Sequence, residues 1–281
     1  MSNKFISLKN FRIGNNLPFV LIAGPCQLEN LNHARELADK LSKICFNLDI
    51  PFIFKGSFDK ANRTSIGSPR GIGIDKGLNI LEKIAQEFNC PVLTDVHETA
   101  QCKTVAEVVD ILQIPAFLCR QTDLLIAAGK TMRPINVKKG QFLAPQDMKY
   151  VADKISSTNN QNIMLCDRGT SFGYNTLVND FRSIPIMQET GYPVVFDATH
   201  SVQYPGAKND TSGGDRKYVP ILSQAACAVG VSALFIEVHQ DPEKAPSDGP
   251  NMMFLSEMDK LLSKLKKIDN LIKNENILAY Q

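Results

Sequence analysis

Short apolar runs alternate with longer amphipathic segments along most of the chain. The first run, Phe19 to Cys26, ends in Gly-Pro, and apolar residues at helical spacing follow from Leu31 to about Phe46. Continuous apolar runs of this length are typical of strands buried on both faces, and the wider spacing is typical of a helix that covers them. The pattern therefore predicts a strand followed by a helix.

This strand–helix unit recurs through the chain. With the first run, seven more make eight predicted strands: Pro51 to Ser57, Pro91 to His97, Ile111 to Ala116, Ile135 to Gly140, Ile163 to Gly169, Pro193 to His200 and Ala233 to His239. Eight strands alternating with helices favour a closed (β/α)8 TIM barrel over an open doubly wound α/β sheet. No GxGxxG motif follows the first strand, which counts against a dinucleotide-binding fold.

Two further features complete the predicted architecture. Short alternating runs around Lys9 and Asn10 predict a β-hairpin at about residues 4–14, outside the barrel pattern. After the eighth strand, apolar residues at helical spacing from Leu255 to Ile268 predict a final amphipathic helix. No linker or low-complexity segment divides the chain, so we predict a single barrel domain over residues 1–281.

Polar side chains gather where the predicted strands end. They are Cys26, Lys55, Asp95, His97, Gln113, Asn136, Lys138, Asp167, Arg168, Asp197, His200, Glu237 and His239. In such barrels the C-terminal strand ends form the active-site face. Buried parallel strands are otherwise apolar throughout, so charges at nearly every strand end predict a polar pocket rather than a solvated surface.

The segment from Lys55 to Ser65 carries the densest group of anion-binding side chains. Lys55, Lys60 and Arg63 fall within nine residues and are interleaved with hydroxyl and amide groups. Further cations follow the fifth and sixth strands. Buried cations need counter-charge, so we expect ligands to supply it, for example as two phosphates and a carboxylate.

Composition and charge limit the kinds of molecule that the protein is expected to bind. A hydrophobic content of 43% allows a large core, and a net charge of +2 gives no reason to expect nucleic-acid binding through bulk charge. The N-terminal residues lack the apolar segment of a secretory signal, and Ala225 to Ile236 is too short to span a bilayer. We therefore expect a cytoplasmic protein without a membrane partner. Seven cysteines without a CxxC pair are typical of reduced, buried thiols.

The strand-end motifs resemble the 3-deoxy-manno-octulosonate-8-phosphate synthase family over about residues 19–250. They are Ala23-Gly-Pro-Cys26, Phe54 to Arg63, Thr94 to Glu98, Gln113 to Asp123, Asn136-Val-Lys-Lys139, Asp167-Arg-Gly169, Phe172-Gly-Tyr174, Asp197-Ala-Thr-His200 and Glu237-Val-His239. The resemblance implies a transferase that joins phosphoenolpyruvate to arabinose 5-phosphate and releases phosphate. Its product, an eight-carbon sugar acid phosphate, is destined for lipopolysaccharide.

The resemblance also implies roles for individual residues. Phosphoenolpyruvate would be held by Lys55, Ser57, Lys60, Gln113, Lys138 and Arg168. The pentose phosphate would be held by Asn62, Arg63 and Thr64, with Ala116 in the same substrate-binding set. Phe117 and Arg120 would reach this site from a neighbouring subunit, so we expect a homotetramer with shared active sites. The expected catalytic residues are Lys60, Asp95, Lys138, His200 and Asp248.

Lys138 has three possible roles: a salt-bridged barrel lysine, a nucleophile that forms a Schiff base, or an anion-binding cation. A nucleophilic lysine must lose its charge. Neighbouring cations would lower the pKa of Lys138, but bound anionic substrates would raise it again, so we favour the anion-binding role.

A metal site is the last expectation. Cys26, His200, Glu237 and Asp248 become neighbours once a barrel closes, and a thiolate, an imidazole and two carboxylates suit a divalent transition metal. The family has a metal-dependent branch with Cys at the first of these positions and a metal-independent branch with Asn. Cys26 indicates the dependent branch, with Mn, Fe, Co, Zn or Cd as the ion. Asp248-Gly-Pro250 is closer to the independent branch, in which Cys26 would only fill space.

Two other functions remain to be weighed. One is the related synthase that uses erythrose 4-phosphate, against which the Lys60-Ala-Asn-Arg63 motif argues. The other is a phosphosugar-binding protein without catalysis, which would bind both ligands but release no phosphate. A complete set of metal ligands argues against it.

Overall fold

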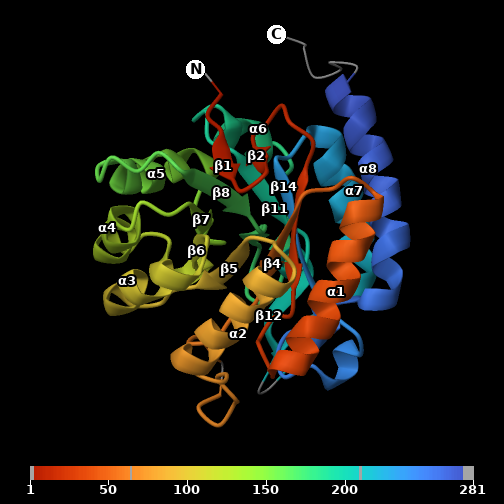
Figure 1. Cartoon of the computed structure of the whole chain (residues 1–281). Coiled ribbons are helices and arrows are strands. Elements are labelled where there is room, and N and C mark those ends of the chain that lie inside the picture. Colours follow the sequence, from red (N-terminus) through yellow and green to blue (C-terminus); the bar gives the residue numbers. More distant parts are fainter. Residues whose placement is uncertain (1–2, 64, 209–210, 275–281) are drawn as a thin grey trace.

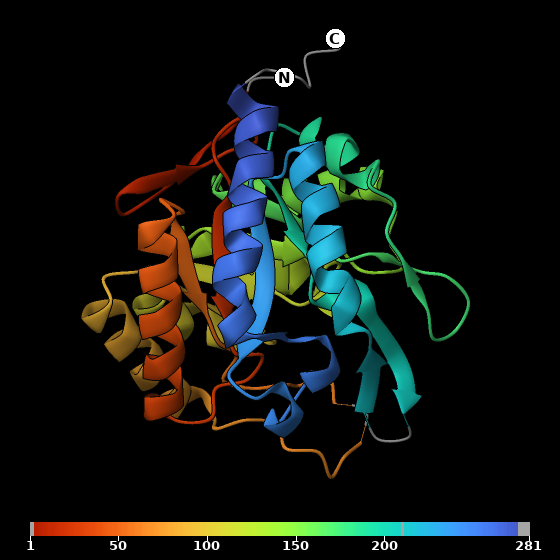
Figure 2. The ribbon, with the colours of Figure 1, turned by 90° about the vertical axis from the view of Figure 1, so that its right-hand side faces the viewer.

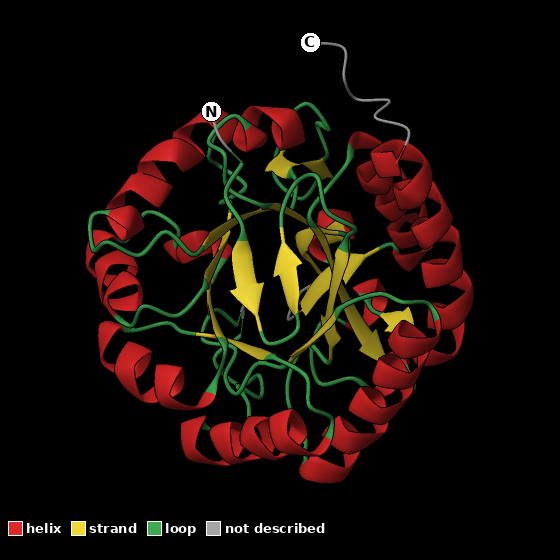
Figure 3. Ribbon diagram, turned by 45° about the horizontal axis from the view of Figure 1, so that its top comes forward, coloured by secondary structure: helices red, strands yellow, loops and turns green. Residues whose placement is uncertain are grey.

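The computed structural model describes residues 3–63, 65–208 and 211–274 (Figure 1). Eight parallel strands form a closed barrel within a ring of helices, which confirms the predicted (β/α)8 fold (Figure 3). The strands are β3 (Val20–Gly24), β4 (Phe52–Lys55), β5 (Val92–Asp95), β6 (Ile111–Ile114), β7 (Ile135–Lys138), β8 (Ile163–Asp167), β11 (Val194–Asp197) and β14 (Ala233–His239). The ring closes because β14 pairs in parallel with both β11 and β3.

A helix follows each barrel strand and turns its apolar stripe toward the barrel. The helices are α1 (Leu31–Asn47), α2 (Ile74–Glu87), α3 (Thr99–Val108), α4 (Thr122–Lys130), α5 (Met148–Ser156), α6 (Ser183–Gln188), α7 (Val219–Val229) and α8 (Met258–Asn274). In α1, Leu37, Leu41 and Cys45 are buried, as the helical spacing predicts. Figure 2 shows α1, α8 and α7 side by side. Among the described helices, none combines the length and apolar character needed to cross a membrane.

The apolar core has an outer compartment between strands and helices and an inner one inside the barrel. The predicted hairpin is present as β1 (Ile6–Leu8) and β2 (Phe11–Ile13), and it lies across the N-terminal end of the barrel (Figure 3). Ile6, Leu8 and Ile13 of this hairpin are buried in the inner compartment. The hairpin closes the N-terminal end, so the barrel interior is reached from the opposite end, where the strands have their C-terminal residues. All seven cysteines are buried and free.

A buried ion pair fastens the last helix to the first barrel strand. Asp269 of α8 accepts the backbone N–H of Phe19 at 3.0 Å and pairs with Lys273 at 2.7 Å. The ammonium of Lys273 also donates to the carbonyl of Val231 at 2.7 Å. Asp269 is only 1% exposed, so it satisfies a backbone donor that would otherwise be buried without a partner just before β3 begins.

Several short elements lie outside the predicted pattern, all in loops at the C-terminal end of the barrel. They are the hairpin of β9 (Thr170–Ser171) and β10 (Leu177–Val178), the hairpin of β12 (Gln203–Lys208) and β13 (Thr211–Gly214), and β15 (Met253–Phe254), which pairs in parallel with the end of β14. Strands of two residues carry no recognisable periodicity, and the segments of β12 and β13 (Gln-Tyr-Pro-Gly-Ala-Lys and Thr-Ser-Gly-Gly) show no apolar alternation, so the sequence pattern missed all of them.

Candidate active site

A cavity of about 480 Å³ opens at the C-terminal ends of the barrel strands. Most of the predicted site residues line it: Lys60, Asn62, Arg63, Asp95, Gln113, Ala116, Phe117, Lys138, Arg168, His200, Glu237 and Asp248. Cys26, Lys55 and Ser57 lie behind this wall, where each contacts one of the lining carboxylates. Arg120 is exposed away from the cavity lining, and Thr64 lies outside the described residues.

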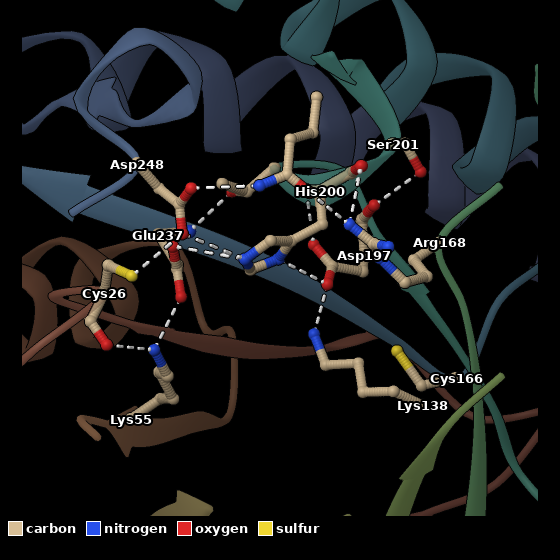
Figure 4. Close-up of polar contacts among 12 residues, drawn as sticks. Cys26, Lys55, Lys138, Cys166, Arg168, Asp197, His200, Ser201, Glu237 and Asp248 are labelled. Atoms are coloured by element: carbon tan, nitrogen blue, oxygen red, sulfur yellow. Dashed lines mark hydrogen bonds and ion pairs between the residues drawn. The ribbon is translucent and has the colours of Figure 1, made fainter. Parts of the chain in front are cut away.

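Three lysines of the site form ion pairs with carboxylates of the same chain. Lys55 contacts Glu237 at 2.5 Å and Lys138 pairs with Asp197 (Figure 4). Lys60 contacts Asp95 at 3.5 Å. We expected ligands to supply the counter-charge, but strand-borne carboxylates already supply it to these three lysines. A bound anion therefore has to share each lysine with its carboxylate.

Arg168 differs from the lysines. Within the part of the chain that the structure describes, it forms no salt bridge; one of its terminal nitrogens donates to Gln203 Oε1 at 2.6 Å and, more weakly, to the His200 carbonyl at 3.4 Å. Burial lowers the pKa of its guanidinium, against the opposing effect of Asp197 and Asp248. An arginine keeps its charge even so. Arg168 is thus a buried cation with donors to spare for an incoming anion.

Asp95 is the centre of a polar network that runs from Ser57, just after β4, across β5, β6 and β7. Its carboxylate accepts from Ser57 Oγ and from Gln113 Nε2, and Gln113 Oε1 accepts from Asn136 Nδ2 at 2.8 Å. Burial alone would raise the pKa of Asp95, but Lys60 and other nearby donors hold it well below its usual range. Asp95 is therefore a fixed anion that sets the positions of Gln113 and Lys60.

Asp197 holds two groups of the site at once. Its Oδ2 accepts from the Lys138 ammonium and from His200 Nδ1, the latter at 2.7 Å, and its Oδ1 accepts the His200 backbone N–H at 2.9 Å. The Lys138 ammonium also lies 3.3 Å from the centroid of the Phe235 ring. A carboxylate and an aromatic face both stabilise the charged lysine, which disfavours the Schiff-base role.

The four expected metal ligands converge on one side of the cavity (Figure 4). Cys26 Sγ lies 3.2 Å from Asp248 Oδ2, and His200 Nε2 lies 3.6 Å from Asp248 and 3.7 Å from Glu237. The ligand atoms of Cys26, Glu237 and Asp248 all lie within 4.8 Å of one another. Elements as far apart in sequence as β3 and β14 bring these side chains together because the barrel closes between them.

The chemistry of this set fits a divalent ion. Glu237 Oε2 is buried and finds no hydrogen-bond partner among the described residues. Burial, followed by the charge of Glu237, raises the pKa of the Cys26 thiol, which then donates its proton to Asp248. Burial lowers the pKa of His200, but Asp197 and Glu237 outweigh this and raise it. The negative charges of Glu237 and Asp248 thus favour the protonated forms of Cys26 and His200, and a bound cation would neutralise these two carboxylates instead.

A second group of potential ligands, Glu29, His33 and His239, lies where β14 ends and α1 begins. His239 Nδ1 accepts the Asp241 backbone N–H at 2.9 Å, which places the proton of the neutral ring on Nε2. That Nε2 lies 2.9 Å from Glu29 and donates to it. Both ring nitrogens are then engaged, so His239 has no lone pair for an ion and acts as a support between α1 and β14.

Arg63 lies at the outer lip of the cavity. Its guanidinium donates to Ser247 Oγ at 2.7 Å and to the carbonyls of Pro246 and Pro69 at 2.6 and 2.9 Å. These contacts link the loop after β4 to the loop after β14. Asn62, beside it, is exposed and lines the same lip.

Phe117 and Arg120 lie in and beside the short helical turn Ala116–Leu118 after β6. Phe117 lines the cavity of its own subunit and is 50% exposed, whereas the Arg120 side chain is exposed and its carbonyl accepts from Lys154 at 3.0 Å. Within one chain, then, Arg120 has no contact with the cavity that would explain a role there.

Sequence reasoning gave no role to two residues that the structure places at the centre of the site. Asp197 was recognised as a polar residue at the end of the seventh strand, but nothing in the sequence indicates that it holds both Lys138 and His200. Gln203, which links Arg168 to Asp248, is the first residue of β12 and belongs to no spacing pattern that could have singled it out.

A closed parallel barrel with four cations and a thiol–imidazole–carboxylate cluster at its C-terminal mouth defines a barrel enzyme that acts on anionic substrates. The chain belongs to the DAHP synthetase I family, whose model matches residues 3–274. It is 63% identical to a 2-dehydro-3-deoxyphosphooctonate aldolase of Granulibacter bethesdensis, over 95% of this chain and 94% of that protein. It is 58% identical to the protein of that name in Rickettsia canadensis, over 97% and 99% of the two chains.

Proposed function

We propose that the protein condenses phosphoenolpyruvate with arabinose 5-phosphate and water, giving 3-deoxy-manno-octulosonate 8-phosphate and phosphate. The observation that carries this assignment is the full-length identity to relatives named 2-dehydro-3-deoxyphosphooctonate aldolase. The cavity agrees with it, because Lys60, Lys138 and Arg168 converge there. The reaction is that of a carbon–carbon bond-forming synthase, acting in the cytoplasm on the route to lipopolysaccharide.

Phosphoenolpyruvate fits the inner part of the cavity. Arg168 offers a planar fork to the phosphate, and Lys60 and Lys138 offer ammonium groups to the remaining negative charge. Lys55 and Ser57 act from behind, through Glu237 and Asp95. Carbon 3 of the enol ester attacks the aldehyde carbon, and water adds at carbon 2. Phosphate then leaves as the bond between carbon 2 and its bridging oxygen breaks. Fixed cations stabilise the charge that shifts onto the departing phosphate.

The pentose phosphate is assigned to the outer lip. Asn62 and Arg63 line it, and Arg63 would exchange its contacts with loop carbonyls for the phosphate oxygens. Phe117 and Arg120 are proposed to serve the pentose site of a neighbouring subunit in a homotetramer. The half-exposed ring of Phe117 and the exposed side chain of Arg120 are available for such a contact.

We also propose that Cys26, His200, Glu237 and Asp248 hold one divalent ion, which is Mn, Fe, Co, Zn or Cd. Two observations support this: Glu237 Oε2 is buried and accepts no hydrogen bond from the described residues, and Cys26 contacts Asp248 closely. When bound, such an ion acts as a Lewis acid that orients the aldehyde or the attacking water. The protein's own part is visible: Asp197 fixes the ring of His200, and Lys55 fixes Glu237.

Phosphate release with two aldehydes tests the assignment. We expect arabinose 5-phosphate to support release in the presence of phosphoenolpyruvate, and erythrose 4-phosphate to be slower by orders of magnitude, because unmatched polar contacts in the site are costly. Reactions without any aldose are the control. Equal release with both aldehydes contradicts the assignment, and binding of both substrates without release identifies a non-catalytic binding protein.

A further inference from the structure

Gln203, the first residue of β12, lies between a cation and an anion of the site. Its Oε1 accepts from Arg168 at 2.6 Å, and its Nε2 donates to Asp248 Oδ1 at 3.0 Å. Arg168 can only donate and the carboxylate of Asp248 can only accept, so the orientation of the amide between them is fixed by chemistry. Figure 4 shows that Arg168 and Asp248 approach the site from opposite sides of His200.

The other cations of the site behave differently. Lys55, Lys60 and Lys138 each contact a carboxylate directly. Asp248 is close enough to raise the pKa of Arg168 against the effect of burial, yet these two side chains form no salt bridge. A neutral amide stands between them and satisfies both with hydrogen bonds.

We propose that Gln203 is a positioning residue that prevents Arg168 and Asp248 from pairing with each other. The inference rests on the proposed function, in which Arg168 takes the phosphate of phosphoenolpyruvate and Asp248 is a metal ligand. Direct pairing would disable both groups at once, since the guanidinium would turn from the phosphate and the carboxylate would turn from Cys26 and His200. Gln203 keeps the two charges apart and leaves each free for its own ligand.

The amide of Gln203 meets both requirements, because it carries one acceptor and one donor group and no charge. Glutamate would accept from Arg168 but repel Asp248, and an apolar side chain of the same length would leave both charges unsatisfied and free to meet. If Arg168 then spent nine-tenths of its time on Asp248, the dissociation constant for phosphoenolpyruvate would rise about tenfold.

The test is the binding of phosphoenolpyruvate, measured by titration calorimetry on chelated protein so that no metal is needed. Gln203→Met should weaken binding about tenfold. Adding Asp248→Asn should restore the affinity to within about threefold of Asp248→Asn alone, because an amide cannot neutralise Arg168. Gln224→Met on α7 is the matched control and should bind normally, because the amide of Gln224 donates to the Pro220 carbonyl of its own helix and lines no part of the cavity.

The outcomes separate the inference from the function on which it rests. Unchanged affinity in Gln203→Met, or weakened affinity that Asp248→Asn does not restore, overturns the proposed role of Gln203 alone. The second of these results would mean that Gln203 acts through packing or through its bond to Arg168 only. Failure of the unmutated protein to bind phosphoenolpyruvate removes the proposed function and the inference together.

Discussion

Asp197→Asn is the most informative single change in the site, because one carboxylate supports two functional groups. In the protein, Oδ2 accepts from Lys138 and from His200 Nδ1, while Oδ1 accepts the His200 backbone N–H. Asparagine has one acceptor and one donor group. Whichever way the amide turns, its NH2 group faces donors, and Lys138 loses its counter-charge while its side chain is only 6% exposed.

The magnitude follows from these contacts. Removing one partner of a buried ion pair costs about 3–5 kcal/mol, and the remaining amide oxygen recovers a part of this, so we expect a loss of about 2–3 kcal/mol. For a chain of this size that lowers Tm by about 3–5 °C. Phosphoenolpyruvate should raise the Tm of the variant by more than it raises the Tm of the unmutated protein, since the substrate supplies the missing negative charge to Lys138.

Thermal denaturation with and without phosphoenolpyruvate, together with phosphate release, measures these effects. We expect kcat to fall at least about tenfold because the ring of His200 loses its orienting partner. Asp180→Asn is the matched control, since Asp180 pairs with Arg182 at the surface and should change neither quantity. A Tm within about 2 °C of the unmutated protein and an unchanged kcat would refute the reasoning from buried charge.

Two further predictions concern the assembly and the metal. If Arg120 serves a neighbouring subunit, mixed oligomers of inactive Arg120→Ala and inactive Arg168→Ala subunits should regain activity, because the two lesions then fall in different sites; no recovery in demonstrably mixed oligomers would assign Arg120 to its own subunit. Exhaustive chelation should abolish phosphate release, and Cys26→Ser should lower the metal content found by elemental analysis, with affinity reduced at least about tenfold. Full activity without detectable metal would instead place the protein in the metal-independent branch and leave Cys26 as a packing residue.

The barrel was predictable because its signal is long and repetitive. Eight buried strands must be apolar on both faces, and the helices that cover them must carry one apolar stripe, so composition and spacing mark both. The residues at the strand ends could also be assigned to one face, because all barrel strands run in the same direction.

The pairing of charges was not predictable from the sequence. Lys138 and Asp197 are separated by two strand–helix units along the chain, and Lys55 and Glu237 come from nearly opposite ends of it. No spacing rule identifies which cation meets which carboxylate across a closed barrel. Gln203 was missed for the same reason, since its role depends on two neighbours that only the tertiary structure brings to it.

The closure of the ring between β3 and β14 has a consequence for the nascent chain. β3 leaves the ribosome early, whereas its neighbour β14 and Asp269 of α8, which holds the Phe19 amide, are made near the end of synthesis. At about 5–20 residues per second, one edge of β3 waits of the order of ten seconds or more for its partner. An unpaired strand edge is a template for association with other chains, so this interval is when the polypeptide most needs protection from aggregation.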